Sequence, residues 1–167
     1  KFKGNSKLLI FGSTYKKEHD EIIKIHQNLS SELKMMIFPH EIDLQEINRL
    51  KTKLGKEAGL YSDYTLDGNY QPIKILIVDS IGILAKAYRY ADFSYIGGAF
   101  NHGLHNILEA FVYKTPLIFG ANHEKFFEAR FLADQPFVRV IDRISELENA
   151  INLLSNARFT DSIQASY

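Results

Sequence analysis

The stretch YIGGAFNHGLHNILEA, residues 95–110, leads from an apolar segment through paired glycines into a helix-like segment. Residues 93–96, which overlap its start, predict a short buried strand. Gly97, Gly98 and Gly103 let the backbone approach a ligand closely, because glycine carries no side chain. The first turn of the predicted helix offers unpaired N–H groups and the positive end of its dipole. The stretch is therefore suited to an anionic or ribose-bearing ligand.

Two polar side chains of this stretch, His105 and Glu109, are four residues apart. In a helix over residues 105–113, this spacing places them on the same face. Asn106 and Glu109 also have the spacing of a capping box, in which both side chains satisfy backbone N–H groups at a helix start. The local pattern leaves a binding role and a capping role open.

Strand-like and helix-like segments alternate along the rest of the chain. The first helix is expected to take Ser13 or Thr14 as its N-cap. The alternation predicts one α/β domain over residues 1–167, with a Rossmann-like, doubly wound parallel sheet covered by helices on both faces. Strands are predicted at 7–11, 34–38, 73–78, 93–96, 116–119 and 137–141, with a further short strand near 61–65 and a turn at 67–69. Helices are predicted at 15–33, 44–54, 83–90, 105–113, 125–133 and 144–154.

Polar clusters follow the predicted strands at their carboxyl ends. In doubly wound sheets ligands bind at this edge, so the clusters are candidate ligand loops. They are Gly12-Ser13-Thr14, Pro39-His40-Glu41, Asp79-Ser80-Ile81-Gly82, Gly97-Gly98-Ala99 and Gly120-Ala121-Asn122-His123.

The composition argues against several classes of protein. Twenty basic and 20 acidic residues give a formal net charge of zero, which argues against a general binder of nucleic acid. With no cysteine, the chain forms neither disulfides nor a thiolate metal site. The longest apolar runs are strand-sized, far below the roughly 20 residues of a membrane-spanning helix. Because the chain begins without methionine, we expect it to be part of a longer protein.

Three common nucleotide and hydrolase motifs do not occur. The turn after the first predicted strand has a single glycine, Gly12, where a dinucleotide-binding enzyme has G-x-G-x-x-G. The sequence contains neither a P-loop nor the nucleophile elbow G-x-S-x-G. His40, His102, His105 and His123 fit no zinc-ligand spacing, so no metal site is predicted.

The motifs at these loops resemble the C-terminal half of the 3-deoxy-D-manno-octulosonic acid (Kdo) transferases. The resemblance extends from about Leu8 to about Leu147, and its motifs occur in the family's order. Together they are more specific than any one motif alone. They are FGST at 11–14, FPHE at 38–41, VDSIGIL at 78–84, YIGGAF at 95–100, GLHNILEA at 103–110 and PLIFG at 116–120.

The resemblance implies one half of a GT-B glycosyltransferase, an enzyme that transfers Kdo from CMP-Kdo to the lipid A precursor without a metal or another cofactor. In that family the C-terminal domain holds the CMP-sugar donor. An N-terminal domain, absent from this chain, carries the acceptor site, the membrane contact and the general base. The whole protein would act in lipopolysaccharide biosynthesis at the cytoplasmic face of the bacterial inner membrane. This chain alone would be soluble and inactive.

The family's donor site can be carried over position by position. Pro39 and His40 would contact the cytidine and the phosphate, and Glu109 would accept hydrogen bonds from the ribose hydroxyls. The donor-binding residues implied in this way are Gly12, Ser13, Thr14, Pro39, His40, Ser80, Ile81, Gly82, Gly98, Ala99, His105, Asn106 and Glu109.

The chain departs from the family's pattern at several of these positions. Many members have Pro-Arg-His where this chain has Pro39-His40-Glu41, so the arginine that meets the donor's negative charge is missing there. Ala99 replaces a serine, Leu104 a glycine and Ile81 a methionine. These differences concern the contacts to the phosphate above all.

Two alternatives share the predicted fold. One is the nucleotide-sugar-binding domain of another GT-B enzyme that uses a UDP-sugar. The loop that begins with Gly97 and Gly98, which we call the glycine loop, and Glu109 would serve that donor equally well. The other is a non-catalytic, Rossmann-like interaction module whose polar loops only cap helices.

Overall fold

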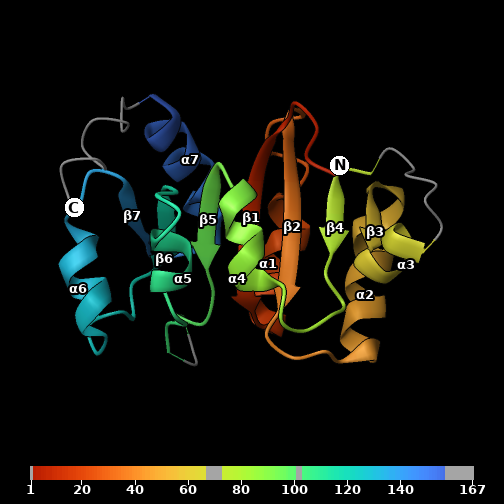
Figure 1. Ribbon diagram of the computed structural model, residues 1–167, viewed down its shortest axis with the longest axis horizontal. Helices are drawn as coiled ribbons and strands as arrows, with labels where there is room; N and C mark the ends of the chain where they lie inside the picture. The colour runs from red at the N-terminus through yellow and green to blue at the C-terminus, as the bar shows by residue number, and fades with distance from the viewer. Residues whose placement is uncertain (1, 67–72, 101–102, 157–167) are drawn as a thin grey trace.

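A computed structural model describes residues 2–66, 73–100 and 103–156 of the chain. Within these residues seven strands form one sheet, and each strand is parallel to its neighbours. Figure 1 shows the sheet with the carboxyl ends of its strands at the lower edge. The predicted α/β, doubly wound fold is confirmed. The order across the sheet is β3 (Ala58–Leu60), β4 (Ile75–Ile77), β2 (Leu33–Pro39), β1 (Lys7–Thr14), β5 (Phe93–Ile96), β6 (Leu117–Gly120) and β7 (Val138–Ile141).

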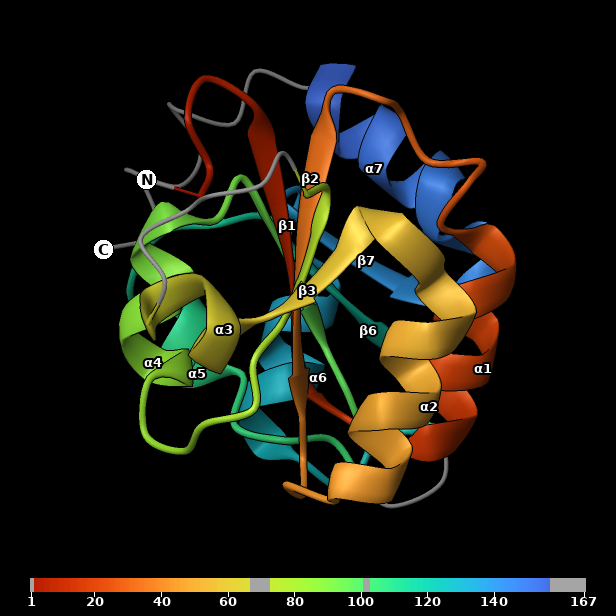
Figure 2. The same ribbon diagram turned by 90° about the vertical axis from the view of Figure 1, so that its right-hand side faces the viewer.

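Helices cover both faces of the sheet (Figure 2). One face carries α1 (Lys16–Ile25), α2 (Leu44–Leu54) and α7 (Leu147–Asn156), and the other carries α3 (Tyr61–Leu66), α4 (Leu84–Ala87) and α5 (Leu108–Phe111). The remaining helix, α6 (Phe127–Ala133), packs beside β7 at one end of the sheet (Figure 1). Short 3₁₀ turns at Gly55–Glu57, Tyr88–Tyr90 and Ile144–Glu146 follow α2, follow α4 and precede α7.

The strands are apolar on both sides because helices cover both faces of the sheet. Five consecutive residues of β1, from Leu8 to Gly12, are buried, and so is every residue of β4, β5 and β6. This explains why these strands read as continuous apolar runs rather than as alternating patterns.

The segments predicted at 61–65 and 15–33 differ in the structure. The segment near 61–65 is helix α3 rather than a strand, because the N–H and the hydroxyl of Ser62 donate to Asp79 at 3.0 and 2.5 Å, which ties this turn to the loop after β4. The first helix ends at Ile25 and its N-cap is Tyr15, so the expected caps Ser13 and Thr14 were wrong. The turn predicted at 67–69 lies outside the described residues.

The helix predicted from residue 105 begins only at Leu108. The N–H of His105 donates to the Gly97 carbonyl at 3.3 Å, which holds this residue against the glycine loop. The Asn106 side chain accepts the N–H of Leu108 at 3.1 Å. His105 and Asn106 therefore belong to the loop, and the predicted shared helix face of His105 and Glu109 was wrong.

The chain reverses its direction across the sheet between β1 and β5. From β1 it moves outward on one side through β2, and from β5 it moves outward on the other side through β6 and β7. In such sheets, ligands bind at the carboxyl edge beside the two strands where this reversal occurs.

Candidate functional site

At the reversal point, the loops after β1 and β5 are in direct backbone contact. The N–H of Gly97 donates to the carbonyl of Gly12 at 2.8 Å. A Cβ on Gly97 would lie 2.4 Å from the carbonyl oxygen of Ser13, and a Cβ on Gly12 would lie 1.8 Å from the hydroxyl of Tyr88. Both glycines are required by this close packing of the protein on itself.

Gly98 continues this contact with a backbone that L side chains rarely adopt. Its φ is +91°, and a Cβ there would lie 2.3 Å from the carbonyl oxygen of Gly103. The N–H of Gly98 donates to the carboxylate of Glu18 at 3.0 Å. One N–H that the sequence suggested for an anionic ligand is thus already bonded to a protein carboxylate.

Glu18, in the first turn of α1, was not singled out from the sequence. It is 3% exposed. Its carboxylate accepts the hydroxyl of Tyr95 at 2.6 Å, the N–H of Gly98 at 3.0 Å and the N–H of Tyr15 at 2.8 Å. Burial, with the neighbouring Glu18 charge, raises the pKa of Tyr95 far above its usual value, so its hydroxyl remains a donor. The only sequence signal was an acidic residue in a first helical turn.

A second buried network begins at Thr14. Its hydroxyl lies 3.0 Å from Nε2 of His19 and 3.3 Å from the carbonyl oxygen of Phe38. Nδ1 of His19 lies 2.9 Å from Glu46. Burial lowers the pKa of His19. The neutral ring then donates from Nδ1 to the Glu46 carboxylate and accepts the Thr14 hydroxyl at Nε2.

Glu46 is also held by Arg49, through two hydrogen bonds of 2.7 Å. Burial alone would raise the pKa of the Glu46 carboxyl, but the hydrogen bonds from Arg49 and His19 keep it below its usual value. Arg49 contacts Asp20 as well, at 2.9 Å. The structure thus places an arginine close to the loop where the family's arginine is missing, but two acidic side chains already bond to it.

The rings of Tyr15, His40 and His105, from the loops after β1, β2 and β5, lie together next to these networks. The rings of His40 and His105 stack with centroids 4.4 Å apart, and Tyr15 lies 4.7 Å from the former and 5.5 Å from the latter. Nε2 of His105 is 3.0 Å from the Tyr15 hydroxyl. The N–H of His40 donates to the carbonyl of Thr14 at 2.8 Å. We call Tyr15, His40 and His105 the ring cluster.

A cavity of about 600 Å³ opens beside the ring cluster between the loops after β1 and β2. Its lining includes acidic groups, Glu41, Asp43 and Glu46, as well as Lys16 and Arg49. It is lined by Thr14, Tyr15, Lys16, His19, Pro39, His40, Glu41, Asp43, Gln45, Glu46 and Arg49.

The other residues proposed from the family resemblance lie at the same edge. Ala99 is fully buried behind the glycine loop. The amide nitrogen of Asn106 donates to Glu109 at 3.4 Å; this is a contact between side chains and not the capping box that the spacing suggested, and the N-cap of α5 is Ile107. The loop with Ser80, Ile81 and Gly82 follows β4 and leads along the carboxyl edge to α4 in Figure 1. Ile81 is 86% exposed there.

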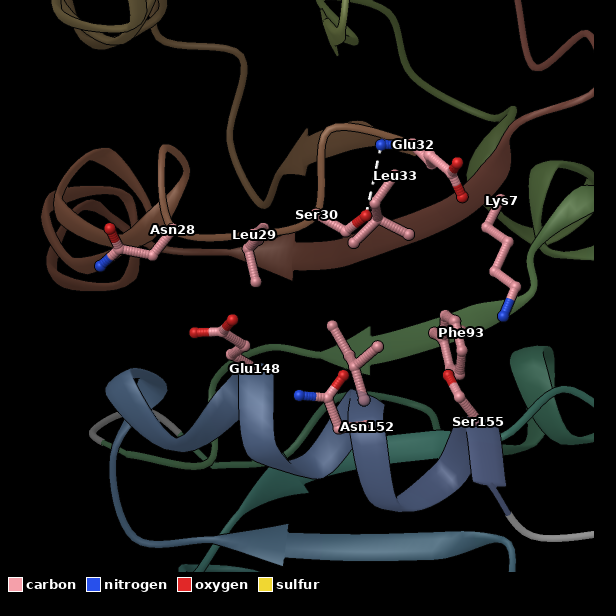
Figure 3. A pocket seen from close by; sticks show the side chains of 11 residues that line it. Lys7, Asn28, Leu29, Ser30, Glu32, Leu33, Phe93, Glu148, Asn152 and Ser155 are labelled. Atoms are coloured by element: carbon pink, nitrogen blue, oxygen red, sulfur yellow. Dashed lines mark hydrogen bonds between the residues drawn. The ribbon is translucent and has the colours of Figure 1, made fainter.

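A second cavity, of about 300 Å³, lies at the amino edge of the sheet. Figure 3 shows Glu148 and Asn152 of α7 facing the segment after α1 that carries Asn28 and Ser30, and Ser155 further along α7 on the side of Phe93. The floor is apolar, whereas the polar side chains of its rim are exposed. No sequence pattern indicated this cavity.

Metal binding and membrane spanning can be assessed for the described residues. Their histidine and acidic side chains form no group of three that could hold a metal ion. Among the helices described, none has the length and apolar character to cross a bilayer. His102, one of the histidines considered from the sequence, lies outside the described residues.

The sequence resembles known proteins over most of its length, although no family model matches it. It is 31% identical over 118 residues, 70% of the chain, to the 3-deoxy-D-manno-octulosonic acid transferase of Chlamydophila psittaci. Over 163 residues, 95% of the chain, it is 29% identical to the transferase of that name from Chlamydia muridarum. A bifunctional glycosyltransferase/methyltransferase of Fusobacterium nucleatum is 27% identical over 161 residues, also 95% of the chain.

The chain covers only part of these relatives. It spans 27% of the C. psittaci protein, 37% of the C. muridarum protein and 25% of the F. nucleatum protein. Its fold also matches the crystal structure of the C-terminal CMP-Kdo binding domain of WaaA from Acinetobacter baumannii, with a TM-score of 0.76 at 20% identity. That match covers 98% of this chain and 88% of the other.

Proposed function

We propose that this chain, which belongs to the Kdo transferase family, binds the CMP-Kdo donor of a glycosyltransferase at the carboxyl edge of its sheet. The observation that carries the proposal is the meeting of three loops at the reversal point. The ring cluster and the 600 Å³ cavity lie where parallel sheets bind nucleotides. The relatives supply the donor's identity, since the structural neighbour is a CMP-Kdo binding domain.

The donor-binding residues proposed from the resemblance differ in what they could offer the donor. Backbone and ring groups would come from Pro39, His40, Gly82 and His105, and polar side chains from Ser13, Ser80, Asn106 and Glu109. Gly12, Thr14, Gly98 and Ala99 are buried, and the Gly98 N–H and the Thr14 hydroxyl already have partners in the protein, so these four would shape the site rather than contact the donor. Ile81, exposed on its loop, would contact the nucleotide through apolar surface. Glu109 is half-buried, and its carboxylate, which already accepts the Asn106 amide at 3.4 Å, would also accept the two ribose hydroxyls.

In the proposed reaction a hydroxyl of the lipid A precursor attacks the anomeric carbon of Kdo, and CMP leaves as an anion. The general base, the acceptor site and the membrane contact would belong to another domain of the whole protein. This chain would stabilise the departing phosphate with His40 and Lys16, which line the cavity. On this proposal the whole protein acts at the cytoplasmic face of the inner membrane, in lipopolysaccharide biosynthesis.

Isothermal titration of the chain with CMP, UMP and UDP tests the proposal. CMP should bind most tightly, and Glu109→Gln should weaken it about tenfold, because a hydrogen bond to a charged group contributes about 1.5 kcal/mol. Glu148→Gln is the matched control, since that carboxylate lies at the other edge of the sheet. Tighter binding of UMP or UDP would indicate a UDP-sugar enzyme instead. Binding of none of the three would contradict the donor site.

A further inference from the structure

We infer that Glu18 is a positioning residue, whose buried carboxylate fixes the loops after β1 and β5 in the arrangement that binds the nucleotide. The inference rests on the proposed donor site and adds a residue that the family resemblance did not assign. Glu18 would not contact the nucleotide, because it is 3% exposed and lies beneath the loops. Its effect would pass through Tyr15 and Gly98.

The three hydrogen bonds of Glu18 connect segments far apart in the sequence. One carboxylate oxygen accepts both the Tyr95 hydroxyl, at 2.6 Å, and the Gly98 N–H, at 3.0 Å. The other oxygen accepts the Tyr15 N–H at 2.8 Å. A single side chain therefore links the start of α1 to the glycine loop, in addition to the backbone hydrogen bond from Gly97 to Gly12.

The two segments that Glu18 joins, at Tyr15 and at Gly98, both adjoin the ring cluster. The Tyr15 backbone that Glu18 holds carries one of the rings. The Gly98 backbone lies beneath another, since a Cβ there would be 3.0 Å from Cδ2 of His105, and the N–H of His105 donates to Gly97. Moving Tyr15 relative to Gly98 would therefore separate the rings that face the cavity.

The hydrogen bonds of Glu18 also limit how a phosphate can bind. The N–H groups of Gly98 and Tyr15 would otherwise be candidates for an anion at a glycine loop and a helix start. Both are bonded to Glu18, so the structure assigns them to holding the loops rather than to the ligand. A negatively charged donor must then be held by other groups of the carboxyl edge.

Two single variants separate positioning from general stability. In Glu18→Gln the amide oxygen can still accept the Tyr95 hydroxyl and the Gly98 N–H, but its NH₂ group would face the Tyr15 N–H, donor against donor. Tyr95→Phe removes one hydrogen bond from the same carboxylate and leaves both loop contacts in place. Both variants should lose stability, whereas only Glu18→Gln should displace one loop from the other.

The test is CMP binding by isothermal titration, with the folded state of each variant checked by its amide NMR spectrum. We expect Glu18→Gln to weaken CMP binding about tenfold and to shift the Tyr15 amide signal. Tyr95→Phe should keep its affinity within about twofold. Equal affinity in wild type and Glu18→Gln would overturn the inference and leave the donor site standing. Absence of CMP binding by the wild type would overturn both.

Discussion

The cavities at the two edges of the sheet are bordered by polar groups that are held in different ways. Near the carboxyl-edge cavity, Glu18, His19 and Thr14 are almost fully buried; His19 is hydrogen-bonded to Thr14, and Glu18 to the N–H of Gly98. At the amino edge, Asn28 and Asn152 are exposed around an apolar floor (Figure 3). A buried polar network is costly if incomplete, and here it fixes backbone positions. The polar groups beside the carboxyl-edge cavity are therefore held in a defined geometry, whereas those around the amino-edge cavity are not.

The largest effect should come from adding one methyl group at the carboxyl edge. Gly98→Ala combines a positive φ with a Cβ 2.3 Å from a backbone oxygen, and should lower the free energy of unfolding by at least about 3 kcal/mol. Gly4, before β1 at the amino edge, also has a positive φ but no atom near its missing Cβ. Gly4→Ala should cost only about 1 kcal/mol. Similar losses for both variants in urea unfolding would remove the proposed difference between the edges.

The next effect concerns the Thr14 hydroxyl. Thr14→Val should lower the free energy of unfolding by about 1–3 kcal/mol, because Nε2 of the buried His19 loses its partner. Thr52 is the matched control, since its hydroxyl bonds to the Asn48 carbonyl on the exposed side of α2. Thr52→Val should change stability by less than about 0.5 kcal/mol. Urea unfolding measures both, and a neutral Thr14→Val would show that the network contributes little.

A smaller effect should appear as a pH dependence. Because burial lowers the pKa of His19, the unfolded imidazole takes up a proton near pH 6.5 while the folded one remains neutral. Its contribution to stability is present above that pH and is lost as the pH falls toward the folded pKa. The slope from this group is at most about 1.4 kcal/mol per pH unit. His19→Gln should flatten the curve of unfolding free energy against pH between pH 7.5 and 5.5. An unchanged slope would show that another group takes up the proton on unfolding.

The smallest effect is expected at the amino edge. Asn152 is exposed on α7 and lines the 300 Å³ cavity. Asn152→Ala should change the free energy of unfolding by less than about 0.5 kcal/mol and leave CMP affinity as it is. If this variant weakened CMP binding instead, the amino-edge cavity would become the better candidate site.

The fold was predictable because its strands are short apolar runs separated by helical segments. The same alternation also predicted that the candidate loops gather at one edge of the sheet, since the carboxyl ends of parallel strands meet there. The segment at 61–65 was misassigned because its tyrosines and threonine favour strands, whereas the contact of Ser62 with Asp79 decides its structure. Such tertiary contacts are not visible in local propensity.

The buried networks of the site were missed for a related reason. Glu18 and His19 lie in a segment that reads as a polar helix start, and Glu18 meets Gly98 across 80 positions of the sequence. The sequence suggested that the N–H groups of the glycine loop and the helix start would face a ligand. It could not indicate that a carboxylate of the same chain already occupies two of them.

The most direct test of the donor site is a map of the amide NMR signals that move when CMP is added to this chain. We predict shifts at the carboxyl edge, at Tyr15, His40, Gly98 and His105, that saturate with a single affinity. Shifts confined to the amino edge, around Asn28 and Ser155, would contradict it, and so would the absence of any shift at millimolar CMP.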